Sequence, residues 1–221
     1  MFRACIFDLD GTLLDTLPTL CRCCNASLAH FSLSPVSAEQ CRGLCRLPIA
    51  EFYPRLLQLG GCPDDRSAEL VEPIRQYDLE IYLKDPCAQT SPFPGIPELL
   101  RELRRRGTAT AVLTNKPAPL AEQVVSSFFP GLLNSVAGQT PDTISKPDPR
   151  SLLHLIQSLS LSREECLFVG DTDVDMRTAR AAGVPLAAVA WGYQDPRSLS
   201  AYEPDWIVRS PEELLPLFIK D

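Results

Sequence analysis

The chain begins with a short apolar run that ends in two carboxylates one residue apart, Asp8 and Asp10, followed at once by Gly11. Such a run is typical of a buried parallel strand, and the glycine favours a turn at its end. Because alternate side chains of a strand point the same way, we expect both carboxylates on one side of the strand end. At about 4 Å and an effective dielectric of about 20, two such charges repel by about 4 kcal/mol. The pair therefore indicates a bound cation, a shared proton or a chemical step.

The same residues have two simpler interpretations. An Asp-x-Asp-Gly sequence also occurs in solvated turns and at the start of calcium-binding loops. A calcium loop requires a glutamate late in a loop of about twelve residues, whereas apolar residues, Leu13 and Leu14, follow Thr12 here. Matching residues at the ends of later strands would favour chemistry over a turn.

Such residues occur in three later segments. A second apolar run ends in Thr114-Asn115-Lys116, and a lysine, Lys146, lies in a loop fixed by prolines just before a predicted helix. A third run, Cys166–Gly170, leads into three alternating aspartates between Asp171 and Asp175. In an open α/β sheet, ligands bind at the edge where the carboxyl ends of the strands meet. The polar residues of all these segments are therefore expected at one site.

Taken together and in this order, the four segments resemble the haloacid dehalogenase-like hydrolases, and the resemblance extends over nearly the whole chain. Three stretches are similar to the phosphoglycolate phosphatase-like branch of that family: Phe7–Leu13, Thr114–Pro117 and Trp191–Tyr193. Most members are Mg²⁺-dependent phosphatases with an aspartate nucleophile. The resemblance therefore implies an α/β fold, with a Rossmann-like parallel sheet core and an inserted all-helical cap domain.

The resemblance also implies a role for each carboxylate of the first segment. Asp8 is the expected nucleophile, which forms an aspartyl-phosphate. Asp10 is the expected general acid toward the leaving oxygen and, later, the general base toward water. With a reference pKa of about 3.9, an aspartate nucleophile is already ionised at neutral pH and needs no activating base.

A Mg²⁺ ion prefers hard oxygen ligands and usually keeps several waters. The family pattern assigns its ligands to Asp8, the backbone carbonyl of Asp10, and Asp171. Asp175 matches a further acidic position that supports the site, and Thr12 is expected to support it as well.

The other polar residues of these segments are expected to hold the phosphoryl group or to cap helices. The Thr114 hydroxyl and backbone amides near Asn115 can bind phosphoryl oxygens, although ordinary strand-end capping is a simpler interpretation. Lys146 supplies positive charge, since a compact ammonium suits one phosphoryl oxygen. Lys116 also falls in a motif but could be a surface residue. Asp173 is expected to be the N-cap of a helix, with a supporting role at the metal as the alternative.

Substrate choice is expected to depend on the cap. Arg42 and Arg46 lie in the cap segment that often faces the active site in this family. They are four residues apart and would share one helix face if the segment is helical. There they could hold a distal carboxylate or a second phosphate of the substrate, or simply form a solvated helix face.

The order of the predicted elements supports the same organisation. Residues 17–84 carry apolar residues at helical spacing with no convincing strand, which predicts a helical cap over residues 15–87. Residues 1–14 and 88–221 then form the catalytic core. There, strands and helices alternate, which predicts a parallel, doubly wound sheet. After the first strand, the strands are expected at Thr108–Thr114, Ser135–Ala137, Cys166–Gly170, Pro185–Ala190 and Trp206–Val208.

Composition limits the function further. The 221 residues carry a net charge of −7, which argues against a general nucleic-acid surface but not against a small anionic substrate. No apolar run reaches the roughly 20 residues of a membrane span, and a strand at the very start leaves no room for a signal peptide. Nine cysteines, an odd count, are typical of a reducing, cytoplasmic setting. Small buried side chains are their simplest interpretation, ahead of a zinc site.

These observations predict a Mg²⁺-dependent phosphatase that hydrolyses a small phosphorylated metabolite, as a monomer or homodimer. Phosphoglycolate is the first candidate by resemblance, and pyrophosphate, sugar phosphates and nucleotides stay open. The phosphomutase branch has a histidine where this chain has Leu20, so mutase activity is not expected. A protein of another class, a non-catalytic phosphorylated receiver or scaffold, is disfavoured by Asp10, which would hydrolyse the phosphoenzyme.

Overall fold

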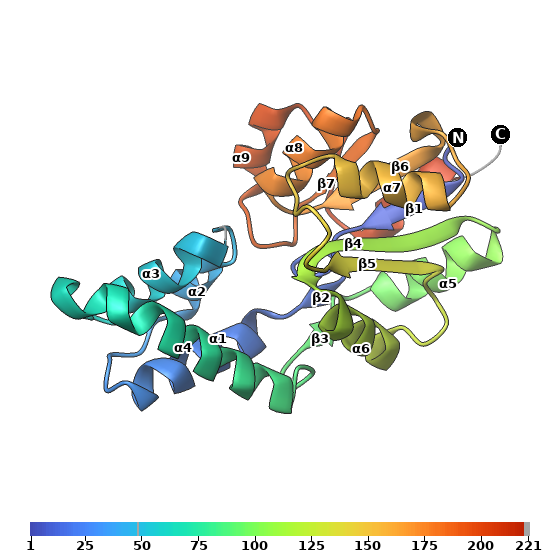
Figure 1. The fold of residues 1–221 in the computed structure, drawn as a ribbon. Coiled ribbons are helices and arrows are strands. Elements are labelled where there is room, and N and C mark those ends of the chain that lie inside the picture. The colour runs from blue at the N-terminus through green and yellow to red at the C-terminus, as the bar shows by residue number, and fades with distance from the viewer. Residues whose placement is uncertain (48, 219–221) are drawn as a thin grey trace. The chain divides into compact units, whose positions relative to one another are not determined.

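The computed structural model describes residues 1–47 and 49–218, and Figure 1 shows its helices and strands. The chain forms two compact units. One consists of residues 1–15 together with those from 91 onward, and the other of residues 16–90. Within the described residues, no helix is long and apolar enough to cross a membrane.

The first unit is built on a six-stranded sheet in which every neighbouring pair is parallel. In their order across the sheet, the strands are β5 (Ser135–Gln139), β4 (Ala109–Pro117), β1 (Ala4–Phe7), β6 (Cys166–Gly170), β7 (Leu186–Val189) and β8 (Trp206–Val208). The chain passes from β1 to β4 and β5 on one side, and then to β6, β7 and β8 on the other. The strand order therefore reverses beside β1, where doubly wound sheets bind ligands. The predicted α/β core is confirmed.

Burial explains why the central strands read as apolar runs in the sequence. All residues of β1 and β6 are buried, as expected for parallel strands covered on both faces by helices. On one face, Ile6 and Phe168 pack with apolar residues of α7 and α8. The helices of this unit are α5 (Ile96–Arg105), α6 (Ala118–Phe128), α7 (Arg150–Ser158), α8 (Asp173–Ala182) and the short α9 (Pro196–Leu199).

Strand β4 differs from the sequence prediction at its carboxyl end. The predicted strand ends at Thr114, whereas β4 continues to Pro117. Its pairing with β5 shifts register after Leu113 and resumes where Pro117 lies opposite Gln139. The prediction was wrong because a Thr-Asn-Lys triplet is typical of a strand end in composition, while pairing with β5 extends the backbone past it. The extension places the polar triplet on a strand rather than in a loop.

A second, two-stranded sheet lies where the chain leaves the first unit and where it returns. Strand β2 (Leu14–Asp15) pairs antiparallel with β3 (Ser91–Pro92). Neither strand was predicted from the sequence, because two residues carry no measurable alternation of apolar and polar side chains. The pairing brings the two connections to the second unit side by side.

Among the described residues of the second unit, the helices are α1 (Leu17–His30), α2 (Ala38–Leu44), α3 (Ile49–Leu59) and α4 (Asp64–Lys84). Helix α1 packs against α2 and α4, and α3 packs against α4. The fully buried side chains between them include Leu28, Leu56, Leu57 and Ile74. The helical spacing of the apolar residues therefore predicted this region correctly, and the inserted helical region is confirmed.

A carboxyl group, Asp78 of α4, lies among these apolar side chains. Ser27 of α1 donates to its Oδ1 at 3.1 Å, and Tyr53 of α3 donates to its Oδ2 at 3.2 Å. Asp78 therefore joins three helices through hydrogen bonds. Burial raises the pKa of Asp78 to about 6, although both hydrogen bonds lower it. Leaving the carboxyl ionised at neutral pH has a cost in stability.

That cost should appear in the pH dependence of unfolding. Because folding raises the pKa of Asp78 above its unfolded value, the folded state binds the proton more tightly, and stability falls as the pH rises from about 4 to about 6. When the pH is raised from 4 to 7, the unfolding free energy of the wild type should fall by up to about 3 kcal/mol more than that of Asp78→Asn, which has no carboxyl group to titrate at this position. Urea unfolding at both pH values measures the difference.

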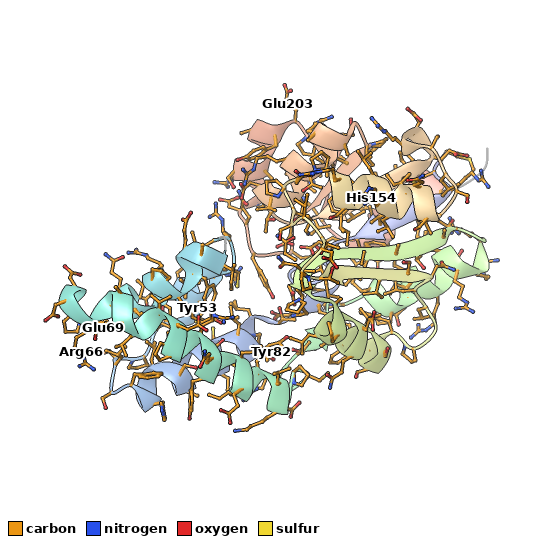
Figure 2. All side chains as sticks on the ribbon, viewed as in Figure 1. Tyr53, Arg66, Glu69, Tyr82, His154 and Glu203 are labelled. Atoms are coloured by element: carbon orange, nitrogen blue, oxygen red, sulfur yellow. The ribbon has the colours of Figure 1, made fainter. Side chains whose placement is uncertain are left out.

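The control is Glu69→Gln, which makes the same carboxyl-to-amide change at an exposed position of α4 (Figure 2). Its unfolding free energy should follow that of the wild type at both pH values. Identical pH slopes for the wild type and Asp78→Asn would contradict the prediction.

Candidate active site

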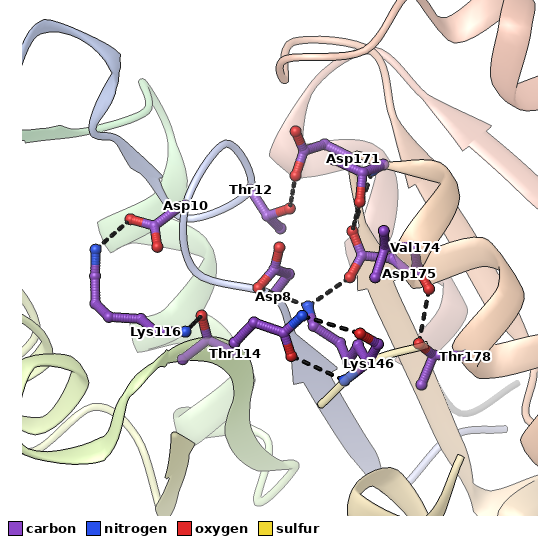
Figure 3. Close-up of polar contacts among 12 residues, drawn as sticks. Asp8, Asp10, Thr12, Thr114, Lys116, Lys146, Asp171, Val174, Asp175 and Thr178 are labelled. Atoms are coloured by element: carbon purple, nitrogen blue, oxygen red, sulfur yellow. Dashed lines mark hydrogen bonds and ion pairs between the residues drawn. The ribbon is translucent and has the colours of Figure 1, made fainter. Parts of the chain in front are cut away.

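Four charged side chains meet at the carboxyl ends of β1 and β6 (Figure 3). Asp8 follows β1, Asp171 follows β6, Asp175 lies in the first turn of α8, and Lys146 lies in the loop before α7. All four are buried. Pairing of the two strands explains the meeting, because the Asp8 amide still donates to the Val169 carbonyl of β6 at 2.8 Å.

Lys146 lies between two of the carboxylates. Its Nζ is 2.8 Å from Asp8 Oδ1 and 2.6 Å from Asp175 Oδ1, and only 4% of its side chain is exposed. Burial alone would lower the pKa of Lys146, but Asp175 and Asp8 raise it above its usual value. The Asn115 side chain fixes this lysine from β4, since it donates to the Lys146 carbonyl at 3.0 Å and accepts from its amide at 2.8 Å.

Asp8 ionises less readily than its residue type suggests. Burial and the nearby Asp175 raise its pKa, Lys146 lowers it, and the resulting pKa is about 7. With only the protein's own charged groups around it, Asp8 is therefore not fully ionised at neutral pH, because a buried carboxylate loses its hydration. The sequence-based expectation of a fully ionised nucleophile was wrong in this respect. A cation beside Asp8 would favour the ionised form.

The carboxylate of Asp171 is tightly enclosed. Thr12 Oγ1 donates to its Oδ1 at 2.9 Å, and the Tyr193 amide donates to its Oδ2 at 2.8 Å. Two glycines make room for it: a Cβ atom at Gly11 would lie 2.3 Å from Asp171 Oδ2, and one at Gly192 would lie 2.2 Å from Asp171 Cβ. Gly11 also has a φ of +88°, a conformation that favours glycine.

Among the described residues, Asp8, Asp171 and Asp175 form a group that can hold a metal ion, with ligand oxygens within 4.8 Å of one another. Burial, with the charges of Asp175 and Asp8, raises the pKa of Asp171 well above its usual value. The cluster holds three carboxyl groups, and Lys146 pairs with only two of them, so the ionised cluster carries excess negative charge. A divalent cation would balance that charge, and buried carboxylate oxygens are ligands that suit Mg²⁺.

The start of α8 is capped by Thr172 and Asp175 rather than by Asp173. The N-cap of α8 is Thr172, and its amide and hydroxyl donate to Asp175 Oδ2 at 3.1 and 2.8 Å. Asp173 is instead the first helical residue, and its carboxylate pairs with Arg177 at 2.8 Å. The N-cap prediction for Asp173 was wrong because the helix begins one residue earlier than expected. Asp175 therefore accepts hydrogen bonds from the start of α8 and also pairs with Lys146.

The three polar side chains at the end of β4 each contact a different group. Thr114 is buried, and its Oγ1 accepts from the Lys116 amide at 3.2 Å. The side chain of Asn115 is engaged with the backbone of Lys146, as described above. Lys116 is no surface residue, since its Nζ lies 2.8 Å from Asp10 Oδ1 and 10% of its side chain is exposed. Asp8 and Asp10 thus pair with different lysines.

The cap candidates lie in the second unit. Arg42 is an exposed residue of α2, which ends at Leu44, and Arg46 is exposed in the turn that follows. A common helix face for the two arginines is therefore not formed, because the helix stops between them. Their part in substrate choice stays a prediction. The nine cysteines, all within the described residues, form no disulfide, and six of them are buried.

A loop after β7 completes the site, and the sequence analysis did not assign it a role. Besides the contact of Tyr193 with Asp171, Trp191 Nε1 donates to the Thr12 carbonyl at 3.0 Å. Gln194 Oε1 accepts from the Asp173 amide at 2.8 Å. The Trp-Gly-Tyr triplet could have indicated this role, because it follows a predicted strand and therefore lies at the same sheet edge as the aspartates.

The fold and site together define a class: a doubly wound α/β protein with an acidic, lysine-containing site at its topological switch point. A family model described as haloacid dehalogenase-like hydrolase matches residues 5–189. The chain belongs to this family.

Curated relatives align along most of the chain. Phosphoglycolate phosphatase 1 of Pseudomonas aeruginosa is 32% identical over 221 residues, which cover 97% of this chain and 79% of the relative. N-acetylmuramic acid 6-phosphate phosphatase of the same species is 36% identical over 220 residues, which cover 96% and 93%. The relatives thus carry two different substrate names.

Solved structures share the fold. One described as a predicted phosphoglycolate phosphatase from Haemophilus somnus has a TM-score of 0.88 and 24% identity, covering 99% of this chain and 98% of that chain. A haloacid dehalogenase-like family hydrolase from Streptococcus pneumoniae has a TM-score of 0.84 and 24% identity, covering 99% of both. These likenesses extend over the sheet and the inserted helices alike.

The close approach at Gly192 makes a testable prediction. A methyl group there would lie 2.2 Å from Asp171 Cβ, so Gly192→Ala must displace Asp171 or the loop that encloses it. We expect Gly192→Ala to lower phosphatase kcat/KM by about tenfold or more, about 1.4 kcal/mol, while the protein stays folded by circular dichroism.

Gly43→Ala is the control, because a Cβ atom at Gly43 meets nothing within 4 Å. It lies within α2, where alanine favours the helix by about 1 kcal/mol. Wild-type activity in Gly192→Ala would show that the loop does not hold Asp171 in place.

Proposed function

We propose that this protein is a Mg²⁺-dependent phosphatase that hydrolyses a small phosphomonoester through an aspartyl-phosphate. The observation that carries the proposal is the buried group of Asp8, Asp171 and Asp175 at the carboxyl ends of β1 and β6, with Lys146 paired to Asp8 and Asp175. Membership of the haloacid dehalogenase-like hydrolases supports it. Residues 1–14 and 88–221 are the proposed catalytic core, and residues 15–87 the proposed cap. The boundaries of the two compact units, after residues 15 and 90, lie within three residues of these bounds.

Asp8 is the proposed nucleophile. One carboxylate oxygen attacks phosphorus in line with the leaving oxygen, a P–O bond to Asp8 forms, and the bond to the leaving group breaks. Water then attacks the same phosphorus and releases inorganic phosphate together with the Asp8 carboxylate. Lys146 and the Thr114 hydroxyl are the proposed ligands of the phosphoryl oxygens during both steps.

Asp10 is the proposed acid and base. It gives a proton to the leaving oxygen in the first step and takes one from the attacking water in the second. Its carboxyl group is partly exposed, with 28% of the side chain accessible, in contrast to the enclosed Asp171. A group that exchanges protons with substrate and water needs such access.

Asp8, Asp171 and the backbone carbonyl of Asp10 are the proposed Mg²⁺ ligands, with Thr12 and Asp175 as supporting residues. The hydrogen bonds from Thr12 and Tyr193 would fix the direction of the Asp171 oxygens toward the ion. When bound, Mg²⁺ would neutralise charge on the phosphoryl group and reduce its repulsion from Asp8.

The proposed substrate is a small phosphomonoester that carries a carboxylate. The relatives named above are phosphatases of phosphoglycolate and of N-acetylmuramic acid 6-phosphate, and both compounds combine a phosphomonoester with a carboxylic acid. Phosphoglycolate is our first choice. Pyrophosphate, sugar phosphates and nucleotides are the alternatives within the family.

A substrate panel with Mg²⁺ tests the proposal. Phosphate release is measured for phosphoglycolate, N-acetylmuramic acid 6-phosphate, glucose 6-phosphate, AMP and pyrophosphate. The expected result is the highest kcat/KM for one of the two carboxylate-bearing compounds. A protein that becomes phosphorylated without releasing phosphate would instead be a receiver or scaffold, and release from none of the compounds would contradict the proposal.

The nucleophile assignment predicts the effect of Asp8→Asn. The amide cannot form the phosphoenzyme, so we expect kcat to fall by roughly a thousandfold or more, about 4 kcal/mol of transition-state free energy. Steady-state phosphate release measures the loss, and circular dichroism checks that the fold remains. More than a few per cent of wild-type turnover in pure, folded variant would remove Asp8 from this role.

The metal assignment predicts a change in the Mg²⁺ titration of Asp171→Asn. This variant keeps the shape of the enclosed side chain but removes its charge, so the half-saturating Mg²⁺ concentration should rise by about tenfold or more. Isothermal titration calorimetry with Mg²⁺ gives a readout without turnover. Asp173→Asn is the matched control, because its carboxylate pairs with Arg177 instead. Equal Mg²⁺ affinity in Asp171→Asn and the wild type would exclude Asp171 as a ligand.

A further inference from the structure

The site contains a second lysine for which the reaction above has no use. Lys116 Nζ lies 2.8 Å from Asp10 Oδ1, with 10% of the lysine side chain and 28% of the aspartate side chain exposed. Figure 3 shows the Asp10 carboxylate turned toward Lys116, while Asp8 faces Lys146. The two carboxylates of the first motif are thus each held by a cation of their own.

The end of β4 aims Lys116 at Asp10. The strand continues through Pro117, and the shift in its pairing with β5 falls between Leu113 and Pro117. Within that interval the Lys116 amide donates to Thr114 Oγ1 at 3.2 Å. The lysine backbone is therefore fixed by strand pairing and by a buried threonine.

Comparison with another lysine shows that this pair differs from an ordinary surface contact. Lys84 pairs with Glu80 at 2.9 Å on α4, but 70% and 63% of those side chains are exposed. Exposed pairs of that kind contribute little, because water screens them and both side chains lose rotamer freedom. Lys116 is mostly withdrawn from water, so its contact with Asp10 is far less screened.

We propose that Lys116 is a positioning residue that orients the Asp10 carboxyl group for proton transfer. The proposal rests on the proposed phosphatase function. It assigns the two lysines to separate tasks, with Lys146 at the nucleophile and Lys116 at the acid–base residue.

Geometry gives the physical reason. Proton transfer requires the carboxyl oxygen to lie within about 2.6–3.2 Å of its partner, and a partly exposed aspartate has several rotamers that miss that position. Without a restraint, repulsion from Asp8 would turn Asp10 away from the reacting oxygen. The ammonium of Lys116 engages Oδ1 and selects one orientation, in which Oδ2 is the oxygen that meets the leaving group.

The leaving group provides the sharpest test. An alkyl phosphate needs a proton on its leaving oxygen, whereas 4-nitrophenyl phosphate releases a stable anion without one. In single turnovers with excess enzyme, we therefore expect Lys116→Met to lower the rate of leaving-group release by about tenfold or more for the best alkyl phosphate of the panel and by less than about threefold for 4-nitrophenyl phosphate. Hydrolysis of the phosphoenzyme, for which Asp10 is the base whichever group has left, should slow equally for both. The enzyme concentration that gives half the maximal single-turnover rate should change by less than about threefold for both.

A double-mutant cycle tests whether Lys116 acts through Asp10. It uses the alkyl phosphate in single turnovers with excess enzyme, and it compares Lys116→Met, Asp10→Asn and the double variant. If Lys116 only orients Asp10, adding Lys116→Met to Asp10→Asn should cause less than about a twofold further loss. Lys116→Arg should recover part of the alkyl phosphate rate, because it keeps a cation of similar reach.

Two controls complete the design. Lys84→Met removes an exposed lysine of an ion pair with the same chemistry and should leave all rates unchanged. A crystal structure of Lys116→Met gives a readout independent of turnover, and the Asp10 side chain should leave the orientation it has beside Lys116.

Three results would overturn the proposal: equal losses in the rate of leaving-group release for both substrates, a raised half-saturating enzyme concentration that marks Lys116 as a phosphoryl ligand, or multiplicative losses in the cycle. An unmoved Asp10 in the crystal structure would overturn it as well. Failure of the phosphatase function itself is recognised separately, because wild-type protein would then release phosphate from neither leaving group.

Discussion

The burial of excess negative charge is the constraint on which this structure depends. Asp8, Asp171 and Asp175 are buried, with ligand oxygens within 4.8 Å of one another, and Lys146 pairs with two of them, Asp8 and Asp175. Removing such charges from water is costly unless cations and hydrogen bonds compensate. Lys146 supplies part of the compensation, backbone and hydroxyl donors supply another part, and a divalent cation would supply the rest. A cluster with this charge is therefore consistent with a metal site.

The buried carboxylates also determine how closely the surrounding backbone segments approach them. The site lies where strand order reverses in the sheet, so the first turn after β1 and the loop after β7 close over one side chain, Asp171. Glycine at positions 11 and 192 allows that approach, because a Cβ atom at either would overlap Asp171. Gly170 serves Asp175 similarly, since its Cβ would lie 2.4 Å from Asp175 Cβ. Small residues thus set the volume in which the charges are held.

The second unit uses a buried carboxyl group differently. Asp78 accepts hydrogen bonds from two hydroxyl groups on neighbouring helices, those of Ser27 and Tyr53. Such a group specifies how the helices pack at some cost in stability. In the sheet unit, by contrast, buried carboxylates are arranged with lysines. Asp78 thus holds helices together through hydroxyl groups, whereas Asp8 and Asp175 are paired with a lysine in the candidate active site.

The sequence by itself determined the α/β core, the inserted helices and the residues that meet at the sheet edge, because strand burial and motif spacing are local patterns. Only the tertiary structure decided which charges pair. The sequence analysis left Lys116 open as a surface residue, yet pairing of β4 with β5 extends the strand and directs the lysine to Asp10. It also took Asp8 to be ionised, whereas burial raises its pKa to about 7. Pairing between distant segments and loss of hydration arise only when the chain folds, so no local pattern records them.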